Sequence, residues 1–292
     1  MFTRRNLIKA TSAAGLLGLT NASPIARTAT SGDAVLGFVG DLLVDRKRPI
    51  EAFEPVLSML EAPDLLFGNL EGTYSDNPRM PPSAPVSLVP EAYNLDVFKK
   101  AGFDVLSMAN NHIVDGGLEV MLENKARLRK QGIATAGAGS NLIEARAPAI
   151  VEAGGLSIAY LAYASVFPRG YEATPFSAGL APLRAHNHYY ELSDDYYLPG
   201  HMPFVATIPM VGDHDNLKAD IAAAKEAADI VVVSFHWGTH MRPFHLTDHE
   251  LRTGHLCIDE GADIVVGHHQ HILRGMEWYK NKPIFYGLGH FV

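Results

Sequence analysis

Short apolar runs recur along the chain, and each run ends abruptly in a cluster of polar residues. Runs of this length that are rich in Val, Ile, Leu and Phe are typical of strands buried on both faces of a parallel sheet. The runs predict strands over residues 35–39, 65–67, 105–108, 158–162, 230–235, 264–266 and 284–286.

The segments between these runs predict helices over residues 96–101, 118–131, 215–228 and 248–260. Three of the four stop immediately before a glycine, which is a favourable residue just past a helix end. Strands that alternate with helices predict an α/β fold, in which helices pack on a mixed, mostly parallel β-sheet. With 292 residues and a hydrophobic fraction of 47%, residues 30–292 can bury the core of one such domain.

Two segments break the alternation of strands and helices. Residues 76–90 are rich in proline, and residues 168–206 are rich in Tyr, His, Pro and Gly. Both are predicted to be excursions at the mouth of a site, either as lids or as plain surface loops.

Residues 1–29 differ from the rest of the chain. Arg4 and Arg5 precede an apolar, small-residue stretch at 13–19, and no acidic residue appears before Asp33. This is the pattern of a signal peptide, and its paired arginines resemble the twin-arginine export signal. We therefore expect a periplasmic or cell-surface protein. Its leader is either cleaved, most favourably after Ala22, or retained as a membrane anchor.

The charge of the chain limits its partners. The formal net charge is −8, and removal of residues 1–22, which hold three basic and no acidic residues, would make it −11. Such an acidic surface argues against nucleic acid as a partner. The single cysteine, Cys257, excludes an intramolecular disulfide and is predicted to be a buried core thiol.

Carboxylate, amide and imidazole side chains follow nearly every predicted strand. In open α/β sheets ligands bind beyond the carboxyl ends of the strands, so these side chains are expected to meet. Together they are the donors that a divalent ion such as Zn, Mn or Fe accepts. Each one alone has a structural explanation, but their recurrence predicts a site for one or two ions. The strand ends supply Asp41, Asn69, Glu71, Asn110, Asn111, His112, His236, His268, His269, His271 and His290.

His269 and His271 are the most specific pair among these residues. In an extended segment residues i and i+2 project the same way, so both imidazoles can face one metal centre. The adjacent His268 would point away and is expected to be structural. His245 and His249 have the spacing of one helix face, where a second metal site is an alternative to ordinary surface residues.

Six motifs occur in an order and spacing that resemble the capsule-synthesis CapA family, a branch of the calcineurin-like metallophosphoesterases. They are GDLLVD (40–45), NLEG (69–72), SMANNHIVDGG (107–117), SFHWG (234–238), ADIVVGHHQHILRG (262–275) and KPIFYGLGHFV (282–292). Many members of this family are linked to poly-gamma-glutamate capsules. The resemblance runs from about residue 35 to the end and implies a layered metallophosphatase-like fold. The family normally continues beyond the last motif, so the resemblance also implies a chain truncated at its C-terminus.

The resemblance assigns roles to individual residues. It makes Asp41 the first metal carboxylate, Glu71 the bridging carboxylate and Asn111 an amide ligand. His112 would face the scissile group as an acid or electrophile. The resemblance completes the two coordination shells with His236, His269 and His271.

Three positions depart from the pattern. The wider superfamily usually has a histidine two residues after the first aspartate, where this chain has Leu43, so the first ion is expected to bind more weakly or to use another group. Glu71 stands where the superfamily prefers aspartate, which alters the metal separation. His290 stands where many relatives have asparagine, and we expect it to be structural or to support the ligands from outside.

Three functions compete at this point. The first is a metal-dependent hydrolase of capsule synthesis that acts on a gamma-glutamyl polymer or related cell-surface substrate, with Arg169, Arg184 and Arg242 as candidates for its carboxylates. The second is a metal-dependent phosphomonoesterase or phosphodiesterase with a smaller anionic substrate. The third is a non-catalytic accessory protein of a membrane complex for polymer synthesis and export. A serine hydrolase and a dinucleotide-binding protein are disfavoured, because neither G-x-S-x-G nor G-x-G-x-x-G is present where it is needed.

Overall fold

The computed structural model of the chain describes residues 11–12, 32–83, 86–191, 195–197 and 199–292. Of the predicted leader, only β1 (Thr11–Ser12) lies within the described residues, and the twin-arginine motif lies outside them. No helix in these ranges is long and apolar enough to cross a lipid bilayer.

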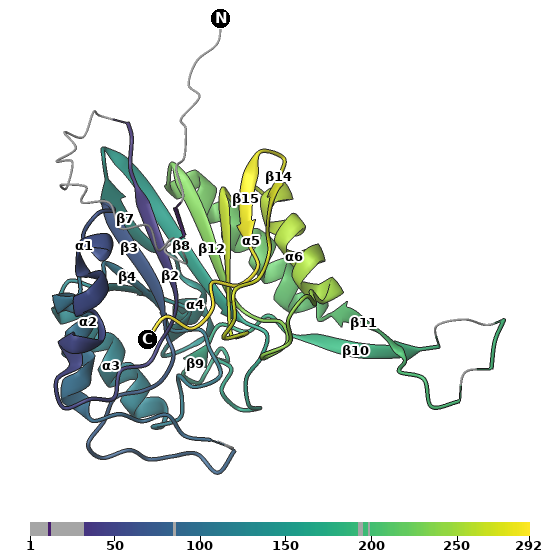
Figure 1. Cartoon of the computed structure of the whole chain (residues 1–292), viewed down its shortest axis with the longest axis horizontal. Helices are drawn as coiled ribbons and strands as arrows, with labels where there is room; N and C mark the ends of the chain where they lie inside the picture. The colour runs from purple at the N-terminus through teal and green to yellow at the C-terminus, as the bar shows by residue number, and fades with distance from the viewer. Residues whose placement is uncertain (1–10, 13–31, 84–85, 192–194, 198) are drawn as a thin grey trace, which may run out of the picture.

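The strands form two main sheets (Figure 1). The first is parallel throughout and has the order β1-β2-β3-β4-β5, with β2 (Leu36–Leu42), β3 (Leu65–Leu70), β4 (Val105–Ser107) and β5 (Ala134–Ala136). The second has the order β14-β15-β13-β12-β8-β7. Its strands are β7 (Ala149–Ala153), β8 (Leu156–Ala164), β12 (Ile230–His236), β13 (Ile264–His268), β14 (Met276–Tyr279) and β15 (Lys282–Phe285).

The predicted mixed, mostly parallel α/β fold is confirmed, with its strands divided between the two sheets. In the second sheet the antiparallel pairs are β7 with β8 and β14 with β15, one at each edge. Every predicted strand is present, and β2 extends three residues beyond its predicted end, to Leu42. The carboxyl end of β2 therefore includes Asp41 within the strand itself.

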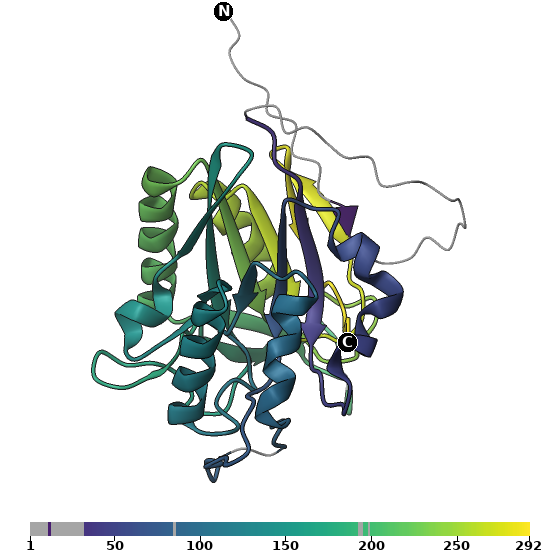
Figure 2. The ribbon, with the colours of Figure 1, turned by 90° about the vertical axis from the view of Figure 1, so that its left-hand side faces the viewer.

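Helices cover the outer face of each sheet (Figures 1 and 2). The first sheet carries α1 (Leu57–Leu60), α2 (Val97–Lys100) and α3 (Leu118–Lys130), with the short helices η1 (Pro49–Ala52), η2 (Glu54–Val56) and η3 (Ala92–Asp96). The second carries α5 (Val211–Ala227) and α6 (Asp248–Asp259), while α4 (Leu142–Arg146) packs beside β8. Helix α5 begins four residues before its predicted start. A capping box between Thr247 and Glu250 fixes the start of α6.

The core fills the space between the two sheets and the space under α5 and α6. Side chains of β8 alternate between the two layers: Tyr160 faces the first sheet, and Tyr163 packs under the helices. Tyr160 stacks on Phe67 of β3, with ring centroids 5.3 Å apart. Because both faces of β8 are buried, its sequence reads as a continuous apolar run.

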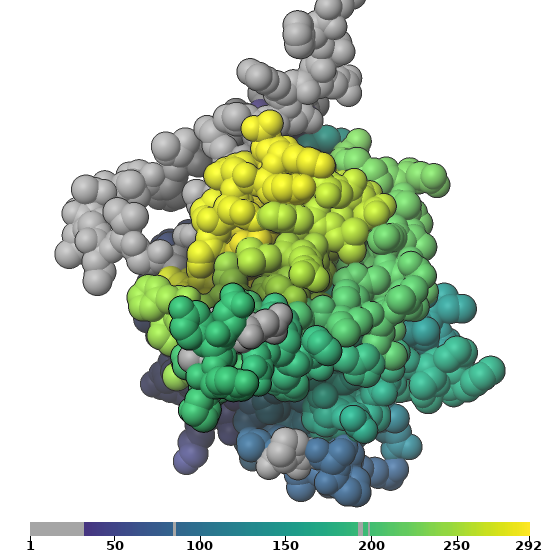
Figure 3. Space-filling view, turned by 90° about the vertical axis from the view of Figure 1, so that its right-hand side faces the viewer, coloured from purple at the N-terminus to yellow at the C-terminus, as the bar shows by residue number. Residues whose placement is uncertain are grey.

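A two-stranded arm projects from this body. Strands β10 (Ala185–Tyr190) and β11 (Phe204–Pro209) pair antiparallel, extend away from the sheets in Figure 1 and point toward the viewer in Figure 3. Thr207 anchors the base of the arm, because its N–H and hydroxyl donate to Asp248 at the start of α6. The predicted excursion at 168–206 therefore contains most of this arm, whose last strand continues to Pro209, and the short strand β9 (Gly179–Leu180), which pairs with β6 (Ala138–Gly139).

Candidate metal centre

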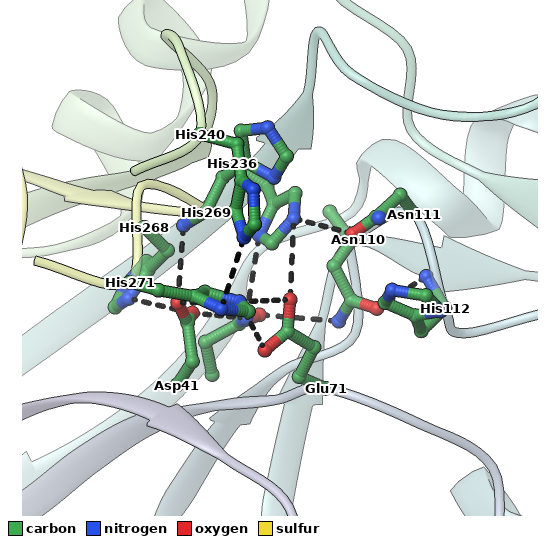
Figure 4. Close-up of polar contacts among 12 residues, drawn as sticks. Asp41, Glu71, Asn110, Asn111, His112, His236, His240, His268, His269 and His271 are labelled. Carbon is green, nitrogen blue, oxygen red and sulfur yellow. Dashed lines mark hydrogen bonds and ion pairs between the residues drawn. The ribbon is translucent and has the colours of Figure 1, made fainter. Parts of the chain in front are cut away.

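Residues at and just after the carboxyl ends of β2, β3, β4, β12 and β13 gather in one cluster of polar side chains (Figure 4). Parallel strands carry their carboxyl ends to the same side, so residues far apart in sequence converge there. The structure places all six predicted metal ligands in this cluster, namely Asp41, Glu71, Asn111, His236, His269 and His271.

The two carboxylates lie at the centre of the cluster. Asp41 and Glu71 are at most 1% exposed, and the ion pairs described for them are all with histidines. Burial, and after it the negative charge of Glu71, raises the pKa of the Asp41 carboxyl to about 8. The Asp41 carboxyl therefore holds a proton at neutral pH unless a metal cation binds there and displaces the proton.

The imidazoles surround these carboxylates. His271 Nε2 lies 3.0 and 3.1 Å from the two Glu71 oxygens, and His236 Nε2 lies 3.7 Å from Glu71 Oε1 and 2.6 Å from Asn111 Oδ1. Burial lowers the pKa of His269 to about 4 and holds that of His236 well below its usual value. The hydrogen bond to Glu71 instead raises the pKa of His271. Neutral buried imidazoles are the form that binds a metal ion.

The backbone of the His269–His271 segment differs from the extended form that the sequence analysis assumed. Strand β13 ends at His268, and His269 and His271 have φ angles of 94° and 57°, in the left-handed region that side chains rarely adopt. Both rings still reach the cluster. Such strain persists at functional sites when the surroundings impose it. Here the His269 N–H donates to Asp41 Oδ2 at 3.2 Å.

His268 is buried, as a structural residue would be, but its ring lies next to the site. It packs on Phe67, and its Nδ1 lies 3.6 Å from Asp41 Oδ1. Burial lowers the pKa of His268 to about 3, which keeps the ring neutral.

Two asparagines orient the Asp41 carboxylate. The sequence analysis counted both among the strand-end donors but gave neither an individual role. Asn69 Nδ2 donates to Asp41 Oδ1 at 2.8 Å. Asn110 Nδ2 donates in turn to Asn69 Oδ1 at 3.2 Å and to the Leu70 carbonyl at 2.7 Å. The signal was present in the sequence, because both residues stand in the same strand-end clusters as the predicted ligands.

His112 lies beside the ligands and is held by a carboxylate. Its Nδ1 is 2.7 Å from Asp115 Oδ2, which also accepts the Leu88 N–H, while Tyr171 donates its hydroxyl to Asp115 Oδ1 at 3.0 Å. Asp115 is fully buried. This arrangement fixes the His112 ring with Nδ1 engaged and leaves Nε2 as the nitrogen available to a substrate. Sequence reasoning missed Asp115 and Tyr171, although Asp115 stands in the same motif as His112.

His240 is a further residue of the site that was not predicted from the sequence. Its Nε2 lies 3.2 Å from His271 Nδ1, on the side of the ring opposite Glu71. The Met241 N–H donates to the Gln270 carbonyl and so holds the loop of His240 over the His269–His271 segment. An outer partner of this kind fixes the tautomer and orientation of a metal-binding histidine.

The three arginines proposed for substrate binding lie in different surroundings. Arg184, at the base of the arm, donates from Nε and Nη2 to Asp213 at 2.8 and 2.9 Å. Arg169 and Arg242 are exposed, in the loops that follow β8 and β12. Their role toward a substrate stays a prediction.

The donor set fits divalent metal ions. Two groups have ligand atoms within 4.8 Å of one another, Asp41 with Glu71 and His236, and Glu71 with His271 and His290. Both contain Glu71, which agrees with its expected bridging role. Mixed oxygen and nitrogen donors suit Zn, Mn or Fe. Ions bound there would supply Lewis-acid polarisation of a scissile bond and activation of water at neutral pH.

Two facing α/β layers with this ligand cluster at their carboxyl edge define a metallophosphoesterase-like protein. Within that class, the chain belongs to the bacterial capsule synthesis protein PGA_cap family, whose profile matches residues 29–292. The resemblance found from the motifs is thereby confirmed.

Several known proteins are similar to the chain. The PGA biosynthesis protein CapA of Bacillus subtilis (strain 168) is 30% identical over 264 residues, which are 89% of this chain and 61% of that protein. A probable polyglutamine synthesis accessory protein of Mycobacterium tuberculosis (strain ATCC 25618 / H37Rv) is 29% identical over 81% of this chain and 58% of its own length. The chain thus spans about three fifths of these two relatives. A solved structure of a putative 5′-nucleotidase from Staphylococcus aureus aligns with a TM-score of 0.49 and 15% identity over 88% of this chain and 49% of that one.

Proposed function

We propose that the chain is an exported, metal-dependent hydrolase of capsule synthesis, which acts on a gamma-glutamyl polymer or a related anionic cell-surface substrate. The observation that carries the proposal is the pairing of two buried carboxylates, Asp41 and Glu71, with histidines at one sheet edge. Burial of two like charges is costly, and a divalent cation between them would offset that cost. The family match and the names of the two curated relatives support capsule or poly-glutamate synthesis as the setting.

The residues beside the cluster supply the remaining chemistry of a hydrolase. His112, oriented by Asp115, is placed to protonate a leaving group or to stabilise a developing oxyanion. Arg242 and Arg169 are exposed cations in neighbouring loops that can bind substrate carboxylates. Under the same proposal a membrane complex for polymer synthesis and export is the partner.

Metal content tests the proposal without a known substrate. Plasma mass spectrometry of the purified chain is expected to find one or two Mn, Zn or Fe ions per chain. The double variant His269→Ala/His271→Ala is expected to lose them, because it removes two of the ligands. A matched control is His186→Ala/His188→Ala, which changes two exposed histidines of the same spacing on the arm. A folded, metal-free parent protein would rule out the metal-dependent hydrolase.

Export is tested separately. The variant Arg4→Lys/Arg5→Lys is expected to leave the protein in the cytoplasmic fraction, because the twin-arginine signal depends on both arginines. Arg27→Lys, a change of the same kind outside the motif, serves as the control. Cell fractionation followed by immunoblotting gives the distribution. Equal export of both variants would contradict the twin-arginine route and leave the metal-site proposal untouched.

A further inference from the structure

The C-terminal segment of the described chain lies directly against the end of β2. The Asp41 N–H donates to the Gly289 carbonyl at 2.9 Å, and the Phe291 N–H donates to the Asp41 carbonyl at 2.9 Å. These backbone contacts form an isolated parallel β-bridge between Asp41 and His290. A Cβ atom on Gly40 would collide with the Gly289 carbonyl oxygen. The glycine thus allows the two backbones to touch, which brings His290 to the same edge as the buried carboxylates.

The His290 side chain faces the outer side of the cluster. Its ring centroid lies 5.1 Å from that of His271, and it shares a ligand-distance group with Glu71 and His271. Two ligand atoms bound tetrahedrally to one ion at about 2.1 Å lie about 3.4 Å apart. The ligand atoms of these three side chains all lie within 4.8 Å of one another, and His271 is already 3.0 Å from Glu71, so only a small adjustment would bring them to one ion.

From this geometry we infer that His290 is a metal ligand, which completes an outer ion site with Glu71 and His271. The inference rests on the proposed metal centre. It adds His290 to the ligands and predicts that the inner ion binds more tightly than the outer one. The first ligand group, which consists of Asp41, Glu71 and His236, is buried throughout. In the second group Glu71 is buried, His271 is half-buried and His290 is exposed. An ion held by the first group would therefore be enclosed by protein, and an ion held by the second group would lie at the solvent edge, where a substrate can reach it.

Leu43 lies near Glu71 but offers no donor to the outer site. It lies two residues after Asp41, and a Cβ atom on Gly72 would meet its Cδ1 at 3.0 Å, which places Leu43 beside the residue that follows Glu71. The side chain is apolar and cannot bind a metal ion, so the donors near Glu71 come from other segments of the chain.

Titration of the metal-free 292-residue chain with Co²⁺, followed by visible absorption, tests the inference. The parent is expected to bind two ions in two phases. His290→Ala, which leaves no donor at this position, is expected to keep the first phase and to weaken the second at least about 10-fold, the smaller end of the range caused by loss of even a supporting residue of a metal site. Because His290 is exposed, the substitution removes little packing, and circular dichroism of both metal-free proteins checks that the fold is retained.

A rescue variant and a matched control make the result specific. Leu43→His in the His290→Ala background is expected to restore most of the affinity, since it offers an imidazole from the residue that follows β2, beside Gly72. His245→Ala, which alters another exposed histidine, is expected to bind both ions as the parent does. If His290→Ala binds both ions with parental affinity, the inference is wrong although the metal centre stands. If the parent binds no Co²⁺ at all, the inference and the proposed function both fall.

Discussion

The metal-free protein is expected to lose most of its stability as the pH falls from 6.5 to 4. Burial lowers the pKa of His249 and of His269 to about 4 and that of His268 to about 3. Between these values and 6.5 the unfolded state binds protons that the folded state excludes, so the free energy of unfolding decreases on acidification. Each histidine contributes up to about 3 kcal/mol, and together they rival the whole stability of a typical domain.

Asp41 acts in the opposite direction. Its pKa is raised to about 8, so the folded metal-free state holds a proton that the unfolded state has released above its ordinary value of 3.8. This contribution declines steadily as the pH rises from 3.8 to 8, so in the acid range it offsets the loss caused by about one of the three histidines. Maximum stability of the metal-free protein is therefore expected near pH 6.5.

Urea unfolding of the metal-free protein at several pH values measures this profile. His249→Gln is expected to lower the number of protons taken up on unfolding below pH 6.5 by about one, because it removes one titrating group that lies away from the metal ligands. His245→Gln, at an exposed position, is expected to leave the profile unchanged. Stability that stays constant between pH 6.5 and 4 would contradict the prediction.

The largest expected effect on activity is that of His112→Ala. Loss of a general acid typically lowers a rate by about 10² to 10⁴, and metal content is expected to stay at the parental level because His112 is not among the six predicted metal ligands. The reaction is followed with gamma-glutamyl oligomers and with a chromogenic phosphodiester, and kcat is compared on whichever substrate the parent turns over.

Two substitutions test how much the residues that hold His112 contribute to its role. Asp115→Asn is expected to lower kcat by about 10-fold or more, because the carboxylate accepts bonds from His112, Leu88 and Tyr171, which one amide oxygen cannot all replace. Tyr171→Phe removes only one of these bonds and is expected to have a smaller effect. Equal activity of His112→Ala and parent would contradict the assigned role. A metal-loaded parent that cleaves neither substrate would favour the non-catalytic accessory function.

The strands and the ligand cluster could be predicted from the sequence because each depends on a local pattern. A run buried on both faces is apolar throughout, and the polar residue that follows it marks the carboxyl end of the strand. Asp41, Glu71 and His236 were found in this way. The same pattern cannot assign a strand to one of two sheets, since a run packed on either side has the same composition. The division into two sheets therefore became visible only in the structure.

The parts of the site that escaped prediction depend on contacts between distant segments. His240 follows a strand-end motif by two residues, and its importance comes from a loop that folds over Gln270. Asn69 and Asn110 matter because one amide donates to the other across neighbouring strands. The pair of residues with positive φ at His269 and His271 also has no signature in the sequence, because residues other than glycine seldom adopt that conformation.

The contact between the end of β2 and residues 289–292 also sets the timing of assembly during synthesis. Asp41 leaves the ribosome early, whereas the Gly289 carbonyl that accepts its N–H is made some 250 residues later. A ribosome that adds about 5 to 20 residues per second separates the two events by more than about ten seconds. The nascent chain therefore carries a strand end without its partner during this interval, and a metal ion can find the finished site only after residues 289–292 have emerged.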